Sequence, residues 1–176
     1  MEKISSKRTY NLMGDINVEN MRKLYEWYWA RITEDAEGWL SFIITSGGGL
    51  NSHGIGFFDL LTSIQKSKIQ TTALGDASSI AVLIFMAGEH RVISPRTSFL
   101  LHETGRSFDK DQRYSTSDVR KALEYMETFE KMYSKTIAER SDGKITGEKV
   151  LEMMRKETIV NAEQALEFGF AHEISS

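Results

Sequence analysis

Short apolar runs alternate along this chain with longer stretches in which apolar residues recur every three or four positions. The short runs are rich in β-branched residues, which is typical of buried strands, and the longer stretches are typical of amphipathic helices. The short runs occupy residues 8–13, 39–45, 69–74, 90–94 and 98–102, with a brief extended piece at 158–160. This order predicts an α/β fold with a largely parallel sheet, in one domain that covers residues 1–176.

The first helix is predicted to begin after Asn17, a plausible N-cap. Its apolar residues share one face at helical spacing, and they are Met21, Leu24, Tyr25, Tyr28 and Ile32. Trp27 lies about 120° from the centre of that stripe. Either a neighbouring element or another subunit is therefore expected to cover Trp27.

The later helices are read from their stripes and their caps. The second helix has an inner stripe of Ile55, Phe58, Leu61 and Ile64. After a polar loop at 103–115, a long helix is predicted from a cap at Thr116 or Ser117 to about Arg140. Its stripe comprises Val119, Ala122, Leu123, Met126, Phe129, Met132, Tyr133 and Ile137. A shorter helix runs from Thr146 to Met154, and a last one has a capping box of Asn161 and Gln164 and ends at Gly169.

Two serines, Ser78 and Ser79, stand where the strand at 69–74 leads into the wholly apolar stretch 80–87. A hydroxyl at the start of such a helix lies near unpaired backbone N–H groups and the positive end of the helix dipole, which favours negative charge beside it. Serine is also among the preferred N-cap residues. Both a nucleophile and an ordinary cap therefore fit the pattern.

Two further features could take part in chemistry. The turn Ser46-Gly47-Gly48-Gly49 at the end of a strand could bring backbone N–H groups close to a developing oxyanion, or it could be a plain glycine turn. His102 stands at the end of an apolar strand, where it could serve as a base or as a structural histidine. The other histidines have no comparable setting, and they are His53, His90 and His172.

Composition narrows the classes of function. The chain has no cysteine, which excludes disulfides, thiolate metal sites and a cysteine nucleophile and fits a reducing compartment. The 22 basic residues are scattered among 25 acidic ones, so nucleic acid is not expected as a partner. Residues 1–8 contain no apolar leader, and no apolar run reaches the roughly 18 residues of a membrane span. We expect a cytoplasmic protein without a membrane partner.

The glycine turn, the serine, the histidine and the terminal capping box stand in an order that resembles the proteolytic subunits of the Clp proteases. These are the ClpP-like serine peptidases of the ClpP/crotonase superfamily. Residues 75–82 are similar to the family's Gly-X-Ala-Ala-Ser-Met-Gly-Ala, and residues 101–104 to its Ile-His-Gln-Pro. Residues 46–49 match its Ser-Pro-Gly-Gly turn, and residues 161–170 match its ending. The similarity runs from about Arg8 to Ile174.

The resemblance implies a fold and a set of roles. The fold is a spiral of ββα units with a long protruding handle helix, here the helix that ends near Arg140. Ser79 becomes the nucleophile of a serine endopeptidase and His102 its base, and Glu157 falls at the position of the acid. The backbone N–H groups of Gly49 and Ile80 would form the oxyanion hole, with no metal and no cofactor.

The resemblance also implies peptide substrates and a homo-oligomer, either a heptameric ring or a tetradecamer. A second ClpP-like subunit or an AAA+ unfoldase are possible partners. Residues 1–7 are fewer than the family's axial loops, so the docking of an unfoldase stays open. The family's acid is Asp rather than Glu157, and the proline of its glycine turn is missing, which marks a divergent member. Two alternatives remain: a catalytically inactive assembly or regulatory subunit, and an acyl-CoA enzyme of the crotonase type.

Overall fold

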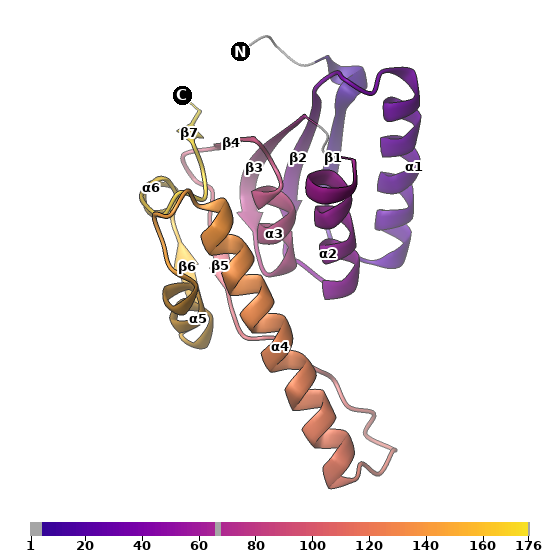
Figure 1. Ribbon diagram of the computed structural model, residues 1–176, viewed down its shortest axis with the longest axis vertical. Coiled ribbons are helices and arrows are strands. Elements are labelled where there is room, and N and C mark those ends of the chain that lie inside the picture. The colour runs from indigo at the N-terminus through magenta and orange to yellow at the C-terminus, as the bar shows by residue number, and fades with distance from the viewer. Residues whose placement is uncertain (1–4, 66–67, 176) are drawn as a thin grey trace.

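The computed structural model of the chain describes residues 5–65 and 68–175. The expectation of no apolar leader rests on residues 1–8, and residues 1–4 of that stretch lie outside the described residues. A five-stranded sheet, parallel throughout, forms the centre of the molecule (Figure 1). In spatial order its strands are β1 (Thr9–Met13), β2 (Leu40–Ser46), β3 (Ile69–Ala77), β4 (His90–Ile93) and β7 (Glu173–Ile174). The predicted α/β class and parallel sheet are confirmed.

One row of buried residues shows why these strands pair as they do. Leu12 pairs with Ile44, Ile44 with Ala73, and Ala73 with Ile93. All four side chains are buried. A shift of one residue would turn each of these side chains to the other face, so the apolar pattern fixes the register. The two-residue strand β7 was not expected, because it is too short to produce a pattern.

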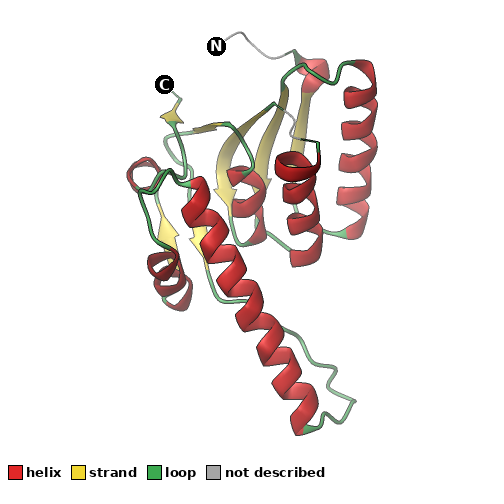
Figure 2. Cartoon of the chain, in the orientation of Figure 1, coloured by secondary structure: helices red, strands yellow, loops and turns green. Residues whose placement is uncertain are grey.

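Helices α1 (Val18–Glu34), α2 (Asn51–Asp59) and α3 (Ile80–Met86) lie together on one side of this sheet (Figure 2). Asn17 caps α1 as predicted, with its side chain accepting from the N–H of Asn20 at 2.9 Å. Trp27 packs within the same chain, with ring centroids 5.3 Å from Tyr10 and 5.6 Å from Phe42. A neighbouring element therefore covers Trp27, and no second subunit is required for it.

The second predicted helix continues from α2 into the π-helical turn η2 (Leu60–Ile64). The N–H of Gln65 bonds the carbonyl of Leu60 five residues back, at 3.0 Å. This wider turn rotates the end of the helix away from its earlier face. The prediction that Ile64 belongs to the inner stripe is therefore wrong, since its side chain is 70% exposed, while Phe57 is buried instead.

The segments that follow β4, apart from β7, lie together beside the sheet (Figure 1). Strands β5 (Phe99–Leu101) and β6 (Thr158–Val160) pair in an antiparallel ladder. The remaining helices are α4 (Thr116–Arg140), α5 (Gly147–Arg155) and α6 (Ala162–Glu167), and the short 3-10 helix η1 (Ser6–Arg8) precedes β1. The capping box of Asn161 and Gln164 and the left-handed Gly169 after α6 are confirmed.

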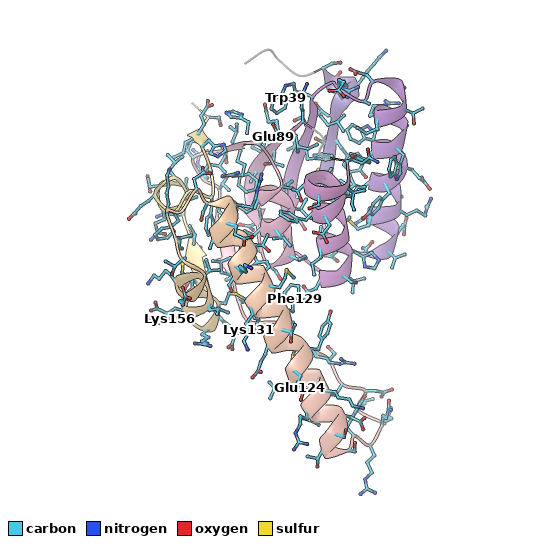
Figure 3. The ribbon with its side chains drawn as sticks, viewed as in Figure 1. Trp39, Glu89, Glu124, Phe129, Lys131 and Lys156 are labelled. Atoms are coloured by element: carbon cyan, nitrogen blue, oxygen red, sulfur yellow. The ribbon has the colours of Figure 1, made fainter. Side chains whose placement is uncertain are left out.

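The long helix α4 starts one residue earlier than predicted. Its cap is Ser115, because Asp118 closes a capping box with it, whereas Thr116 and Ser117 are helical. The half of α4 that carries Glu124 runs away from the body, and the helix reaches the body near Phe129 (Figure 3). Val119 and Leu123 on the projecting half are each about half exposed. None of the helices in the described ranges is long and apolar enough to cross a membrane.

Candidate active site

Ser79 occupies the sharp turn between β3 and α3. Its backbone has φ 55° and ψ −131°, and residues other than glycine rarely adopt such a positive φ. No side chain caps α3, and within the described part of the chain the hydroxyls of Ser78 and Ser79 form no hydrogen bond. Neither serine therefore acts as an ordinary N-cap. Ser79 lines a pocket, and its hydroxyl has no hydrogen-bond partner among the described residues.

Distant segments hold this turn in place. The N–H of Ser78 donates to the carbonyl of Ser46 at 2.9 Å, and the N–H of Ser79 donates to the carbonyl of Leu100 at 2.8 Å. Gly48 lies directly against the serine, since a Cβ added to it would stand 2.7 Å from the Cβ of Ser79. Only glycine fits at position 48, because φ there is also +101°.

Two backbone donors beside Ser79 have no partner. Among the described residues, the N–H groups of Gly49 and Ile80 form no hydrogen bond, and both residues line the pocket above the serine. Gly49 has φ +146°, and a Cβ on it would overlap the carbonyl of Ile16. The Ile80 N–H is free because it belongs to the first turn of α3. Two unpaired donors at a pocket wall are suited to an oxyanion.

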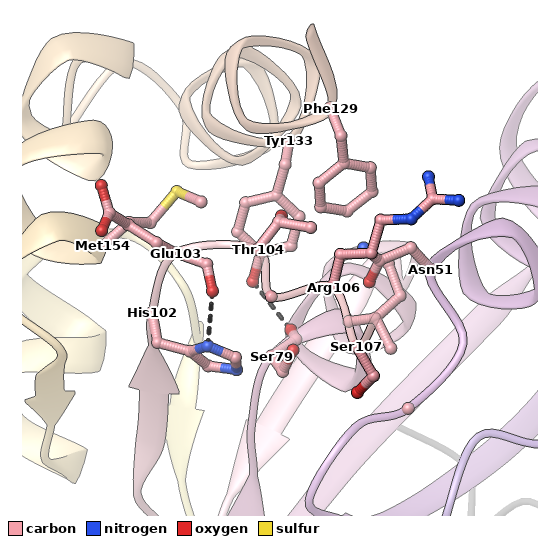
Figure 4. Close-up of a pocket in the computed structure, with 13 residues that line it drawn as sticks. Asn51, Ser79, His102, Glu103, Thr104, Arg106, Ser107, Phe129, Tyr133 and Met154 are labelled. Carbon is pink, nitrogen blue, oxygen red and sulfur yellow. Dashed lines mark hydrogen bonds between the residues drawn. The ribbon is translucent and has the colours of Figure 1, made fainter. Parts of the chain in front are cut away.

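His102 follows the last residue of β5 and is partly exposed in the same pocket. Its Nδ1 lies 2.7 Å from the carbonyl oxygen of Glu103 (Figure 4). A carbonyl can only accept, so Nδ1 carries a proton in this contact, and in a neutral ring Nε2 then has the lone pair. This neutral tautomer leaves Nε2 able to act as a base.

Glu157 stands between α5 and β6, in a left-handed conformation with φ 49°. The β5–β6 ladder ends at the pair of Leu101 and Thr158, and His102 and Glu157 are the next residues of the two segments beyond that pair. Its side chain is exposed and, within the described ranges, its carboxylate makes no hydrogen bond or ion pair. The role of Glu157 as the acid stays a prediction, since the Glu103 carbonyl occupies Nδ1.

These groups meet in a pocket of about 460 Å³. It is lined by Gly49, Asn51, Ser79, Ile80, His102, Glu103, Thr104, Gly105, Arg106, Ser107, Phe129, Tyr133 and Met154. Four of the five sequence-predicted site residues are thus brought together, and Glu157 is the one outside the lining. Figure 4 shows the aromatic rings of Phe129 and Tyr133 above the serine, with Arg106 at one side.

Sequence reasoning placed Tyr133 only in the apolar stripe of α4. In the structure its hydroxyl donates to the backbone carbonyl of Ser79 at 2.8 Å. Burial raises the pKa of Tyr133, so the phenol stays protonated and remains a donor. A buried phenol needs a polar partner, which is the signal in the sequence that could have singled it out.

Among the described residues, no group of three or more histidine, aspartate or glutamate side chains could hold a metal ion. The pocket holds a free hydroxyl, an imidazole with an available nitrogen and two unpaired N–H donors. These are the parts that acyl transfer through a covalent intermediate requires.

Comparisons with known proteins point to one family. A family model described as Clp protease matches residues 1–176. The ATP-dependent Clp protease proteolytic subunit 1 of Tropheryma whipplei is 28% identical over 148 residues, which cover 80% of this chain and 67% of that relative. The subunit 1 of Corynebacterium glutamicum is 26% identical over 137 residues, covering 77% and 63%. The subunit 4 of Streptomyces avermitilis is 27% identical over 143 residues, covering 78% and 59%.

Proposed function

Because this chain belongs to the Clp protease family, we propose that it is a serine endopeptidase in which Ser79 and His102 are the reacting pair. The observation that carries the proposal is that a hydroxyl without a partner, an imidazole with a free Nε2 and two unpaired N–H donors line one pocket. The curated relatives are themselves named as proteolytic subunits.

In the proposed reaction, His102 Nε2 takes the proton of Ser79 as Oγ bonds to the carbonyl carbon of a peptide. The N–H groups of Gly49 and Ile80 receive the negative oxygen, a contribution of several kcal/mol when donors are preorganised, about 3 for a single one. The imidazolium then gives its proton to the leaving nitrogen as the C–N bond breaks. Water, activated by the same imidazole, hydrolyses the acyl-enzyme.

We assign Glu157 as the acid that stabilises the imidazolium. Its position directly beyond the last β5–β6 pair, at the end where His102 leaves β5, supports this assignment. Its exposed carboxylate would have to turn towards the ring and replace the Glu103 carbonyl at Nδ1. A carboxylate stabilises a positive imidazole better than a neutral carbonyl does, so this exchange favours proton transfer.

Membership of the Clp protease family also suggests an assembly and a partner for this chain. We propose a homo-oligomer, a heptamer or two stacked heptamers, that encloses peptide substrates. The half-exposed apolar residues on the projecting half of α4 support it, and they are Val119, Leu123 and Tyr125. The relatives are named as ATP-dependent, so a partner ATPase belongs to the proposal.

One observation favours a second candidate, an inactive assembly or regulatory subunit. Among the described residues, no hydrogen bond joins Ser79 Oγ to His102, and Nδ1 is held by Glu103 rather than by a carboxylate. In such a subunit the pair would stay unaligned in the assembled state.

The test is intact-mass detection of a fluorophosphonate adduct, run beside light scattering for the assembly size. Wild type and Ser78→Ala are expected to gain one adduct, and Ser79→Ala and His102→Ala none. Ser78→Ala is the matched control because Ser78 is the neighbouring buried serine. An assembled oligomer that gains no adduct would reject the peptidase and support the inactive subunit.

A further inference from the structure

Tyr133 reaches the nucleophile turn from α4, a helix that starts far from it in the chain. Its side chain is buried, and its hydroxyl donates to the carbonyl oxygen of Ser79 at 2.8 Å. Figure 4 shows this contact as a dashed line directly beneath the ring. No other side chain in the described part of the chain forms a hydrogen bond to the backbone of Ser79.

The bonded carbonyl belongs to the same peptide unit as the N–H of Ile80. A peptide unit is planar and its C=O and N–H point in opposite directions. Fixing the oxygen of Ser79 therefore fixes the direction of the Ile80 N–H, which has no partner and lines the pocket. A hydrogen bond to the carbonyl also polarises the unit and strengthens its N–H as a donor.

This peptide unit needs such support, because Ser79 has a positive φ of 55°. Residues in sparsely populated backbone regions persist only when their surroundings hold them there. The Ser79 carbonyl also accepts from the N–H of Val82 at 3.1 Å, so it keeps one partner without the phenol. The phenol therefore matters more for the orientation of the Ser79–Ile80 peptide unit than for giving the Ser79 carbonyl a hydrogen-bond donor.

We propose that Tyr133 is a positioning residue of the oxyanion hole, which acts through the Ser79–Ile80 peptide unit. This inference rests on the proposed peptidase function. It assigns to the buried end of α4 a direct influence on the donor that receives the oxyanion.

The test is Tyr133→Phe, which removes only the hydroxyl. Tyr25→Phe is the matched control, since Tyr25 is half-buried against Phe57 and its hydroxyl forms no hydrogen bond among the described residues. Removal of a direct oxyanion donor lowers kcat by about 10² to 10³, so loss of an indirect support should lower it by about tenfold. KM for a fluorogenic peptide should stay within about twofold, because the lost interaction matters only in the transition state.

A second readout does not depend on activity. The chain contains two Ser–Ile peptides, Ser63–Ile64 and Ser79–Ile80, so labelling serine carbonyls with ¹³C and isoleucine nitrogens with ¹⁵N yields two correlated signals. In Tyr133→Phe the Ser79–Ile80 signal should move, with its carbonyl resonance upfield, while the Ser63–Ile64 signal stays in place.

The outcomes separate this proposal from the function on which it rests. A lower kcat with an unchanged KM and a shifted Ser79 carbonyl supports it. An unchanged kcat in an active enzyme, or an unshifted carbonyl, overturns it. A wild type inert to both peptide and fluorophosphonate rejects the peptidase, and the carbonyl signal alone then decides whether Tyr133 holds the peptide unit.

Discussion

Gly48→Ala is the substitution that most directly tests the geometry of the nucleophile turn. The new Cβ would lie 2.7 Å from the Cβ of Ser79 and 2.9 Å from the carbonyl oxygen of Ser78. Carbon atoms in contact normally stand about 3.5–4.0 Å apart, so Ser79 must move by roughly 1 Å. The left-handed φ of +101° adds strain of about 1–3 kcal/mol for any residue with a side chain.

Two consequences follow from this displacement. A misplacement of about 1 Å can lower the rate about 10²-fold, so fluorophosphonate labelling and peptide cleavage should fall by about that factor. Strain and overpacking together should destabilise the fold by about 3 kcal/mol, which corresponds to a fall in Tm of about 10 °C for a domain of this size.

The matched control is Gly47→Ala, one residue earlier in the same turn. Gly47 has no left-handed φ, and a Cβ on it would meet nothing within 4 Å. The assays are the labelling rate by intact mass and thermal unfolding by circular dichroism. A Gly48→Ala variant that labels at the wild-type rate, with the Tm of Gly47→Ala, would refute the placement of Gly48 against the serine.

Three further predictions concern charge. Glu157→Gln should lower kcat by about tenfold or more if the carboxylate of Glu157 stabilises the imidazolium of His102, and the exposed control Glu163→Gln should leave kcat unchanged. Equal kcat values for the two variants would assign the orienting role to the Glu103 carbonyl. Arg91→Met should lower the free energy of unfolding, measured by urea titration, by about 3 kcal/mol or more, because the buried guanidinium donates to four main-chain carbonyls. The exposed control Arg22→Met should leave that free energy almost unchanged. Burial, and then the charge of Arg91, lower the pKa of His172 below its ordinary value of 6.5. The unfolded chain therefore binds a proton at His172 more tightly than the folded chain does, so the free energy of unfolding should fall as pH drops from about 7.5 to 5.5. His172→Gln should make this pH dependence weaker. A pH dependence as steep as that of the wild type in His172→Gln would contradict the assignment.

The strands of the central sheet could be predicted because short runs rich in apolar and β-branched residues mark them, and the residues of the buried face then fix the register. The row from Leu12 to Ile93 is such a case, and its members pair as the pattern requires. The errors arose where tertiary or side-chain geometry decides. Ile64 is exposed because a π-helical turn rotates it, and Ser115 caps α4 because Asp118 closes its box.

The residues of the candidate site differ in how much of their position and contacts the sequence could predict. Ser79 and His102 each follow a strand, and the start of β5 runs beside the end of β3, where the N–H of Ser79 donates to the carbonyl of Leu100. This long-range pairing brings the two residues to one pocket, and the strand pattern of the sequence does not reveal it. The side chain of Glu157 is exposed although its backbone adjoins the last β5–β6 pair, which His102 also follows, and the direction of a side chain cannot be inferred from the sequence. Tyr133 was missed as a polar contact because periodicity identifies a buried face without showing what lies beneath it.

The nucleophile turn depends on contacts that form only in the complete fold. Ser78 is bonded to the end of β2, Ser79 to β5, and the carbonyl of Ser79 to a side chain of α4. None of these partners is near the serines in the chain, and the local sequence alone would favour a relaxed backbone over a positive φ. The strain at Ser79 is therefore supported by long-range pairing. A free hydroxyl held beside unpaired donors is the consequence, because a serine in a relaxed conformation could instead have capped α3.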